Sequence, residues 1–250
     1  MSLALLLAAI FCASFVLTMV GLGGGLVFSP LFVLIGFPVT TAVSASLFLN
    51  GIAACSAAIT YYRQKMIDVK TAIPLLVTST LAAPFGAMLT GVIDIRIFAG
   101  IMALVIFLAA MRMLFSGKTD ARATSTNIQG HILGGCAIGV LVGLMGGLLG
   151  IGGGVFIVPL LIYVLKMSTK SAAATSIFIV VFSSFSGFVA HISLAGTDWN
   201  FILLAGLFSF AGGQMGSRIM SAKLKGRAVR KIFGVVLLVF FLKLLQKAFL

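Results

Sequence analysis

Long apolar stretches separated by short polar turns dominate the chain. Uninterrupted apolar segments run at about 41–61, 71–91, 96–115, 171–192, 199–219 and 231–249. A helix of about 20 residues crosses the roughly 30 Å hydrocarbon core of a bilayer. Each of these segments is therefore predicted to be one transmembrane helix, and the chain is predicted to be an all-α polytopic membrane protein.

Two further apolar stretches are too long for a single crossing. Leu3 to Phe37 and Ile132 to Leu165 would each extend roughly 50 Å as continuous helices. A cluster of glycines interrupts each stretch near its middle, at 21–25 and at 150–154. The pattern predicts a segment that enters the membrane, breaks at depth and returns as a short helix.

The glycine clusters belong to an internal repeat, which is a strong indicator of architecture. Gly21-Leu22-Gly23-Gly24-Gly25 recurs 129 residues later as Gly150-Ile151-Gly152-Gly153-Gly154, and Pro159 follows the second cluster as Pro30 follows the first. Further landmarks recur in the same order: Ser46 and Ser176, Ser56 and Ser186, Asp68 and Asp198, Gly86 and Gly216, Arg96 and Arg230, Gly100 and Gly234.

This repetition divides the chain into two membrane repeats that form one integral membrane domain. We place repeat 1 at residues 1–117 and repeat 2 at residues 129–250, with a polar linker at 118–128. Each repeat is predicted to contain a glycine-broken helical hairpin followed by three transmembrane helices.

Composition excludes a soluble protein. Hydrophobic residues make up 61% of the chain and charged residues only 8%, against about 25% charged in soluble domains. Cys12, Cys55 and Cys136 lie inside apolar runs without metal-ligand spacing, so we interpret them as packing residues. Residues 1–20 have no basic segment and no small-residue cleavage site, so no signal peptide is expected.

The net charge of +13 would suggest nucleic-acid binding in a soluble protein. Here the basic residues lie between apolar segments, as the positive-inside rule requires, so we expect no nucleic-acid partner. If each broken segment enters and returns, 14 basic residues collect on the cytoplasmic side and 3 on the other. Equivalent loops of the two halves then lie on opposite sides. The charges therefore predict inverted-topology repeats with both termini outside.

Inverted repeats with broken helices are typical of secondary transporters, whose sites lie near the midplane. Glycines allow the backbone to turn there, and a helix N-terminus offers partial positive charge and free amide donors to an anion. Close helix packing is the alternative role of membrane glycines. We assign that role to Gly135, Gly139, Gly143 and Gly147, and to Gly212 and Gly216.

Hydroxyl and amide side chains on the following helices could complete such a site, although serine and threonine in membrane helices often only bond their own backbone. Ser46 and Asn50 are four residues apart and share a helix face. The predicted substrate-binding residues are Gly23, Gly24, Gly25, Ser44, Ser46, Asn50, Gly152, Gly153, Gly154, Thr175, Ser176 and Gln214.

Catalytic chemistry has little support in the sequence. The chain has no glutamate, and its four aspartates fall near span ends or in the linker. It also lacks a phosphate-binding loop, a zinc-protease motif and a convincing nucleophile–base pair. We therefore predict no enzyme activity, no metal site and no cofactor.

The duplicated element Gly-x-Gly-Gly-Gly followed by proline, at Gly21–Pro30 and Gly150–Pro159, carries a family resemblance. The serine-containing helices at Ala42–Ser46 and Ala173–Ser176, the Asp198-Trp199 pair and the Gly212–Gly216 spacing extend it over the whole chain. The chain resembles the sulfite exporter TauE/SafE family of membrane transporters. The resemblance implies movement of sulfite, thiosulfate, sulfoacetate or a related sulfonate across a bacterial or archaeal cytoplasmic membrane, often outward.

The leading hypothesis is a secondary transporter, an exporter of a small sulfur-containing anion, that works by alternating access between its two repeats. Its expected partners are this anion and the lipid bilayer. The alternatives are an uptake permease for a similar anion, a membrane-embedded enzyme acting on a lipid or thiol, and a non-transporting subunit of a larger complex.

Overall fold

The computed structural model describes residues 3–89, 107, 111, 128–190 and 199–249, and all secondary structure in these ranges is helical. The predicted span 96–115 and the linker 118–128 lie largely outside the described residues. The helices are α1 (Leu3–Met19), α2 (Gly25–Leu34), α3 (Val39–Arg63), α4 (Val69–Met88), α6 (Ile128–Leu149), α7 (Gly154–Tyr163), α8 (Thr169–Ala190), α9 (Trp199–Ala222) and α10 (Gly226–Phe249).

The other predicted spans are helical. Within the described chain, α3, α4 and α8 are long and apolar enough to cross a membrane, and α1 and α7 are shorter apolar helices. The two long apolar stretches are broken as predicted, because α1 ends before the first glycine cluster and α2 begins within it, while α6 and α7 flank the second cluster in the same way.

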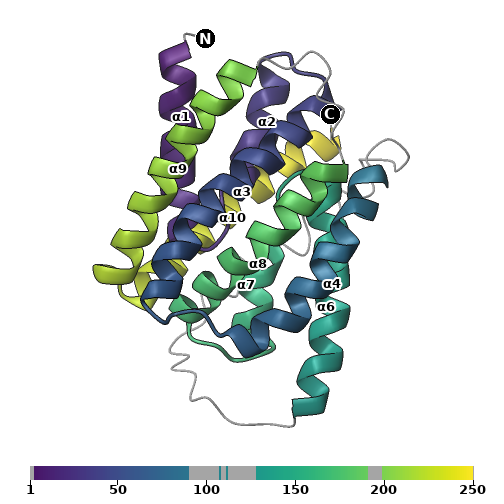
Figure 1. The fold of residues 1–250 in the computed structure, drawn as a ribbon, viewed down its shortest axis with the longest axis vertical. Helices are drawn as coiled ribbons and strands as arrows, with labels where there is room; N and C mark the ends of the chain where they lie inside the picture. Colours follow the sequence, from purple (N-terminus) through teal and green to yellow (C-terminus); the bar gives the residue numbers. More distant parts are fainter. Residues whose placement is uncertain (1–2, 90–106, 108–110, 112–127, 191–198, 250) are drawn as a thin grey trace.

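Helices α1, α3 and α9 run in one direction (Figure 1). Gly212 of α9 packs against Phe11 and Ser14 of α1, and one turn later Gly216 packs against Thr18, so the two helices advance together. Between α3 and α9, the Ser209 hydroxyl donates to the Leu49 carbonyl at 2.9 Å and the Ser56 hydroxyl to the Phe210 carbonyl at 2.8 Å.

Helices α4, α6 and α8 run in the opposite direction. Gly143 and Gly147 of α6 lie against Ser79 and Ala83 of α4, so these two helices also advance together. Ser186 of α8 donates to the Thr80 carbonyl of α4 at 2.7 Å. The two sets meet where α3 and α8 cross in antiparallel fashion.

Corresponding helices of the two halves form corresponding contacts. By sequence position α1 corresponds to α6, α3 to α8 and α4 to α9. The α1–α9 pair therefore has its counterpart in α6–α4, and α3–α9 in α8–α4, all of which are extensive contacts. Helix α1 from the N-terminal half thus packs against the C-terminal half, and α6 from the C-terminal half packs against the N-terminal half.

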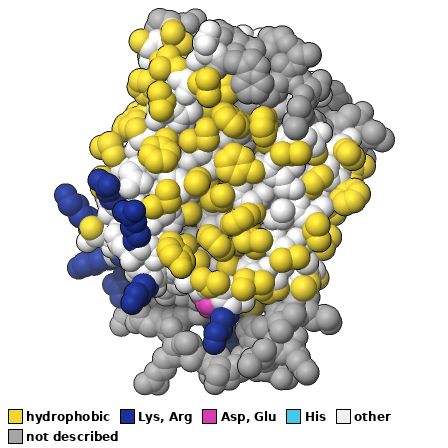
Figure 2. All heavy atoms as spheres, in the orientation of Figure 1, with side chains coloured by type: hydrophobic (Ala, Val, Ile, Leu, Met, Phe, Trp, Pro, Cys, Tyr) yellow, Lys and Arg dark blue, Asp and Glu magenta, His cyan; other side chains and the backbone are white. Residues whose placement is uncertain are grey.

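The surface separates apolar and basic side chains. Hydrophobic side chains cover the middle of the face in Figure 2, and lysines and arginines gather at its lower left edge. This is the end where α3 and α9 end and α4 and α8 begin, as the bond from Lys170 to the Ser221 carbonyl at 2.8 Å and the bond from Ser171 to the Met66 carbonyl at 3.0 Å show. An apolar belt with one basic end is what a multi-pass membrane protein presents to lipid.

The glycine contacts of α6 give a stability prediction. A Cβ atom on Gly143 would lie 2.8 Å from the Ser79 Cα atom and 2.9 Å from the Ala82 Cβ atom, so Gly143→Ala must separate α4 from α6. We expect it to destabilise the fold by about 1–3 kcal/mol and to lower the melting temperature of the purified protein.

Gly206→Ala of α9 is the matched control for this experiment. The atom nearest to its added methyl is the flexible end of the Ile52 side chain, at 3.1 Å. Because alanine favours helix over glycine, this variant should melt at or above the wild-type temperature. Equal melting of the two variants would contradict the packing role of Gly143.

Candidate functional site

Each of the two breaks is built from glycines with left-handed backbone. Gly21 and Gly23 have φ of 88° and 73°, while Gly150, Gly152 and Gly153 have φ of 70°, 73° and 81°. Only glycine adopts these values without strain. The glycines at the first and third positions of the motif therefore have the same conformation in both turns, but the fourth position does not: Gly24 has φ of −105°, whereas Gly153 has φ of 81°. Each turn leads into a short helix, α2 or α7.

The two turns contact each other inside the protein. A Cβ atom on Gly25 would lie 2.9 Å from the Ile151 carbonyl oxygen, and one on Gly154 would lie 2.9 Å from the Leu22 carbonyl oxygen. The last glycine of each cluster thus lets the other turn approach. The start of α2 and the start of α7 therefore lie close together.

Serines from the following helices cross between the breaks in a reciprocal pattern. Ser46 of α3 donates to the Gly150 carbonyl at 2.9 Å, and Ser176 of α8 donates to the Gly21 carbonyl at 2.8 Å. Both side chains are fully buried. Their hydroxyls satisfy carbonyls that the broken helices leave open, which removes a cost of roughly 1–3 kcal/mol for each buried unpaired group.

Asn50 links the two breaks directly. Its Oδ1 atom accepts from the amides of Gly24 and Gly25 at 2.5 and 2.9 Å, and its Nδ2 atom donates to the Ile151 carbonyl at 3.1 Å and to the Ser184 hydroxyl at 2.8 Å. The sequence analysis predicted that the amides of the first break bind an anion. In the structure they donate instead to the side chain of Asn50.

The second break lacks such a side chain. Val180 occupies the position on α8 that corresponds to Asn50 on α3. Ser183 donates to the Gly152 carbonyl at 2.9 Å. In the described part of the chain, however, the buried amides of Gly153 and Gly154 donate to no acceptor. Buried amides without partners are rare in proteins, so these two amides are candidate donors to a ligand.

The remaining predicted residues have different surroundings. Asn50 Oδ1 lies where a Cβ atom of Gly23 would stand. Ser44 is buried. Thr175 accepts from the Asp68 amide at 3.0 Å and so supports the turn before α4. Gln214 does not join the breaks; it lines a separate pocket near the basic end of α9.

The structure also brings in residues that the sequence argument left out of the site. Ser183 contacts the second break and Ser184 contacts Asn50. Both serines lie one helical turn after Val180, and this spacing is the sequence signal that could have assigned them to the site. Arg63 and Arg218 line the pocket of Gln214. In the sequence, both arginines indicate only which end of the helices faces the cytoplasm.

Comparison with known proteins identifies the family of the chain. The family profile described as "Sulfite exporter TauE/SafE" matches residues 6–244. The probable membrane transporter protein YunE of Bacillus subtilis is 26% identical, over 95% of both chains. YdhB of the same organism, also named a probable membrane transporter protein, is 24% identical over 86% of this chain and 89% of its own length.

An archaeal protein gives a similar match. The probable membrane transporter protein MJ0441 of Methanocaldococcus jannaschii is 28% identical over 69% of this chain and 66% of its own. No solved structure matches the chain significantly. The family match covers nearly the whole chain and includes both glycine breaks, as the duplicated motif predicted. The chain belongs to the sulfite exporter TauE/SafE family of membrane transporters.

Proposed function

We propose that the protein is a secondary transporter that exports a small sulfur-containing anion, such as sulfite, thiosulfate, sulfoacetate or a related sulfonate. The observation that carries this proposal is the pair of buried amides of Gly153 and Gly154 at the start of α7, beside the contact between the two breaks. Outward transport and a sulfur-containing substrate are supported by the description of the family as a sulfite exporter.

The anion binds at the second break. The N-terminus of α7 carries partial positive charge and the two amide donors, which together suit an oxyanion without any lysine or arginine. Asn50 supports this assignment. Its partly negative Oδ1 atom accepts from the amides of Gly24 and Gly25, which correspond in sequence to those of Gly153 and Gly154, so such a pair of amides can bind an oxygen of an anion. The first break is thus closed by the protein and the second is left for the substrate.

The two repeats, 1–117 and 129–250, have inverted topology. This part of the proposal is supported by α1, α3 and α4 each running opposite to the corresponding helix α6, α8 or α9. The basic end of the bundle faces the cytoplasm under the positive-inside rule, so both termini lie outside the cytoplasmic membrane of a bacterium or archaeon.

Alternating access requires the breaks to separate, because Gly25 and Gly154 are in contact with the opposite turn in this conformation. The glycine contacts that join α1 to α9 and α4 to α6 are closely packed and resist sliding. Motion is therefore concentrated at the crossing of α3 and α8. The two moving groups are α1, α3 and α9 against α4, α6 and α8, and each group draws on both repeats.

Enzyme activity is not part of the proposal. Asp68 holds the only side-chain carboxylate in the described ranges, and it accepts from the amide and the hydroxyl of Thr71, at 3.3 and 2.9 Å, at the start of α4. A carboxylate committed to capping a helix is poorly placed to act as a general acid or base.

Val180→Asn tests the site of the anion. It places on α8 the side chain that closes the first break, so its oxygen should occupy the amides of Gly153 and Gly154. The initial rate of labelled sulfoacetate or sulfite flux in proteoliposomes would be measured in both directions. We expect it to fall about tenfold, because the anion loses one charge-assisted hydrogen bond to the protein.

Val180→Leu is the matched control, because leucine has the shape of asparagine without its hydrogen-bonding atoms. It should retain flux within about threefold of wild type, which corresponds to well under one hydrogen bond. If Val180→Asn and Val180→Leu transport equally well, the second break is not the anion site. If wild-type protein moves neither anion, the substrate class is wrong.

Cysteine labelling tests the inverted topology. In a background without Cys12, Cys55 and Cys136, single cysteines would replace exposed residues at the two ends of the bundle. A membrane-impermeant maleimide added to intact cells should label Thr40→Cys and Asn200→Cys but not Gln64→Cys or Lys223→Cys. If Thr40→Cys and Asn200→Cys differ in labelling, and Gln64→Cys and Lys223→Cys also differ, the inverted arrangement is rejected.

A further inference from the structure

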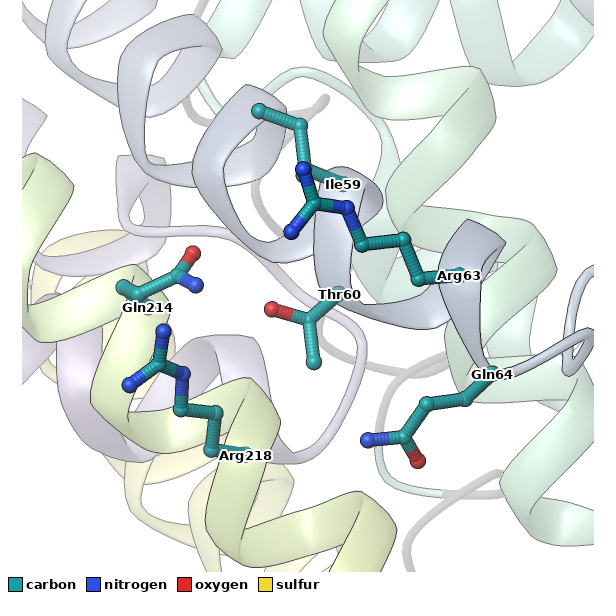
Figure 3. Close-up of a pocket in the computed structure, with 6 residues that line it drawn as sticks. All are labelled: Ile59, Thr60, Arg63, Gln64, Gln214 and Arg218. Carbon is teal, nitrogen blue, oxygen red and sulfur yellow. The ribbon is translucent and has the colours of Figure 1, made fainter.

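A pocket lies between the ends of α3 and α9, away from the glycine breaks. Its volume is about 160 Å³, and Figure 3 shows its side chains gathered from the two helices. The lining residues are Ile59, Thr60, Arg63, Gln64, Gln214 and Arg218.

Two guanidinium groups give the pocket its charge. Arg63 and Arg218 are separated by 155 positions in the sequence, yet both line the same cavity. Neither forms an ion pair with a carboxylate in the described part of the chain, where Asp68 is bound to Thr71. Two like charges at one cavity repel each other, and an anion between them offsets that repulsion.

The inner wall of the pocket is polar and ordered. With its oxygen toward Arg218, the Gln214 carboxamide accepts from Nη2 at 3.2 Å and Nε at 3.3 Å, and from the Thr60 hydroxyl at 3.3 Å. Its nitrogen then donates to the Ser56 carbonyl at 2.8 Å. Thr60 is buried, whereas both arginines are exposed. The Arg218 side chain is thus oriented by Gln214 and remains open to a ligand.

A line of polar contacts leads from this pocket into the bundle. Ser56 donates to the Phe210 carbonyl at 2.8 Å, and Ser209 donates to the Leu49 carbonyl at 2.9 Å. Leu49 directly precedes Asn50, whose side chain joins the two breaks. Hydrogen bonds therefore recur along the α3–α9 contact between the pocket and the proposed transport site, among apolar residues such as Ile52 and Ala53.

We propose that this pocket is a second anion site, which binds the oxyanion head group of a sulfonate or sulfate between Arg63 and Arg218. The inference rests on the proposed function, for which it supplies the first binding position at the basic end of the bundle. Planar guanidinium groups suit an oxyanion, because each can give two parallel N–H donors. The phosphate of an anionic lipid has the same chemistry, so the experiment must separate the two sources.

The site is a weak one. Ion pairs with exposed arginines are screened by water and salt, and each contributes only a few-fold in affinity. Together the two arginines should change affinity about tenfold. Weak binding suits a position that collects the anion and then releases it.

Protection of a single cysteine tests the pocket. Gln64→Cys, in the background without native cysteines, would be alkylated by a neutral maleimide in purified full-length protein in detergent. Sulfoacetate should slow this reaction, and Arg63→Gln with Arg218→Gln should raise the half-protecting concentration about tenfold. Arg227→Gln removes one exposed charge from the same end without lining the pocket, and it should leave protection unchanged.

Two further experiments distinguish a soluble anion from a lipid head group, and lost binding from misfolding. In nanodiscs of phosphatidylcholine, added phosphatidylglycerol should not protect residue 64; protection by this lipid alone would overturn the assignment to a soluble anion. Arg63→Lys with Arg218→Lys keeps the charge and should retain part of the protection, which separates lost binding from a misfolded double variant.

The assay reads binding at residue 64 and requires no flux. If sulfoacetate protects residue 64 but neither sulfoacetate nor sulfite is transported, the pocket stands and the proposed function fails. If transport is normal while residue 64 is unprotected, or is protected equally in the double glutamine variant, the pocket is rejected alone.

Discussion

Every helix that breaks inside an apolar bundle leaves backbone amides and carbonyls that water cannot reach, and the structure depends on how they are satisfied. Here each break takes some of its partners from the other half. Ser46 and Ser176 cross to carbonyls of the opposite turn, and Asn50 joins amides of one turn to a carbonyl of the other. These bonds require the turns to touch, and the turns can touch only because Gly25 and Gly154 carry no side chain. The glycine clusters, the serines and the crossing of α3 and α8 are thus consequences of one requirement.

Duplication gave two similar breaks, but the two are not chemically equal. The first is sealed by Asn50, while the second faces Val180 and keeps two buried amides without an acceptor in the described residues. The two breaks therefore differ in which backbone amides a side chain of the protein satisfies. Under the proposed function the anion binds at the second break, and an anion held by one helix terminus and no fixed charge is not bound too tightly to leave.

Much of this fold was readable from the sequence because membrane segments obey strong length and polarity constraints. The breaks at the glycine clusters and the helices α3, α4, α8, α9 and α10 followed from apolar run length and from the repeat. Pairings between distant segments did not follow. Nothing in the local sequence of Asn50 says that it occupies the Gly24 and Gly25 amides rather than a ligand, and Arg63 and Arg218 converge only through the packing of α3 on α9. Such pairings depend on tertiary geometry, which hydropathy and spacing do not encode.

The exchange of first helices between the repeats has a consequence for how the protein is made. Helix α1 enters the membrane early in synthesis, but its packing partner α9 begins only at Trp199. Until then the surface of α1 that receives Gly212 and Gly216 must rest against lipid or against the insertion machinery. Helix α4 meets its packing partner earlier in synthesis, because α6 begins at Ile128. Assembly therefore cannot be completed one repeat at a time, and an isolated N-terminal half would present two unmatched helix faces to the bilayer.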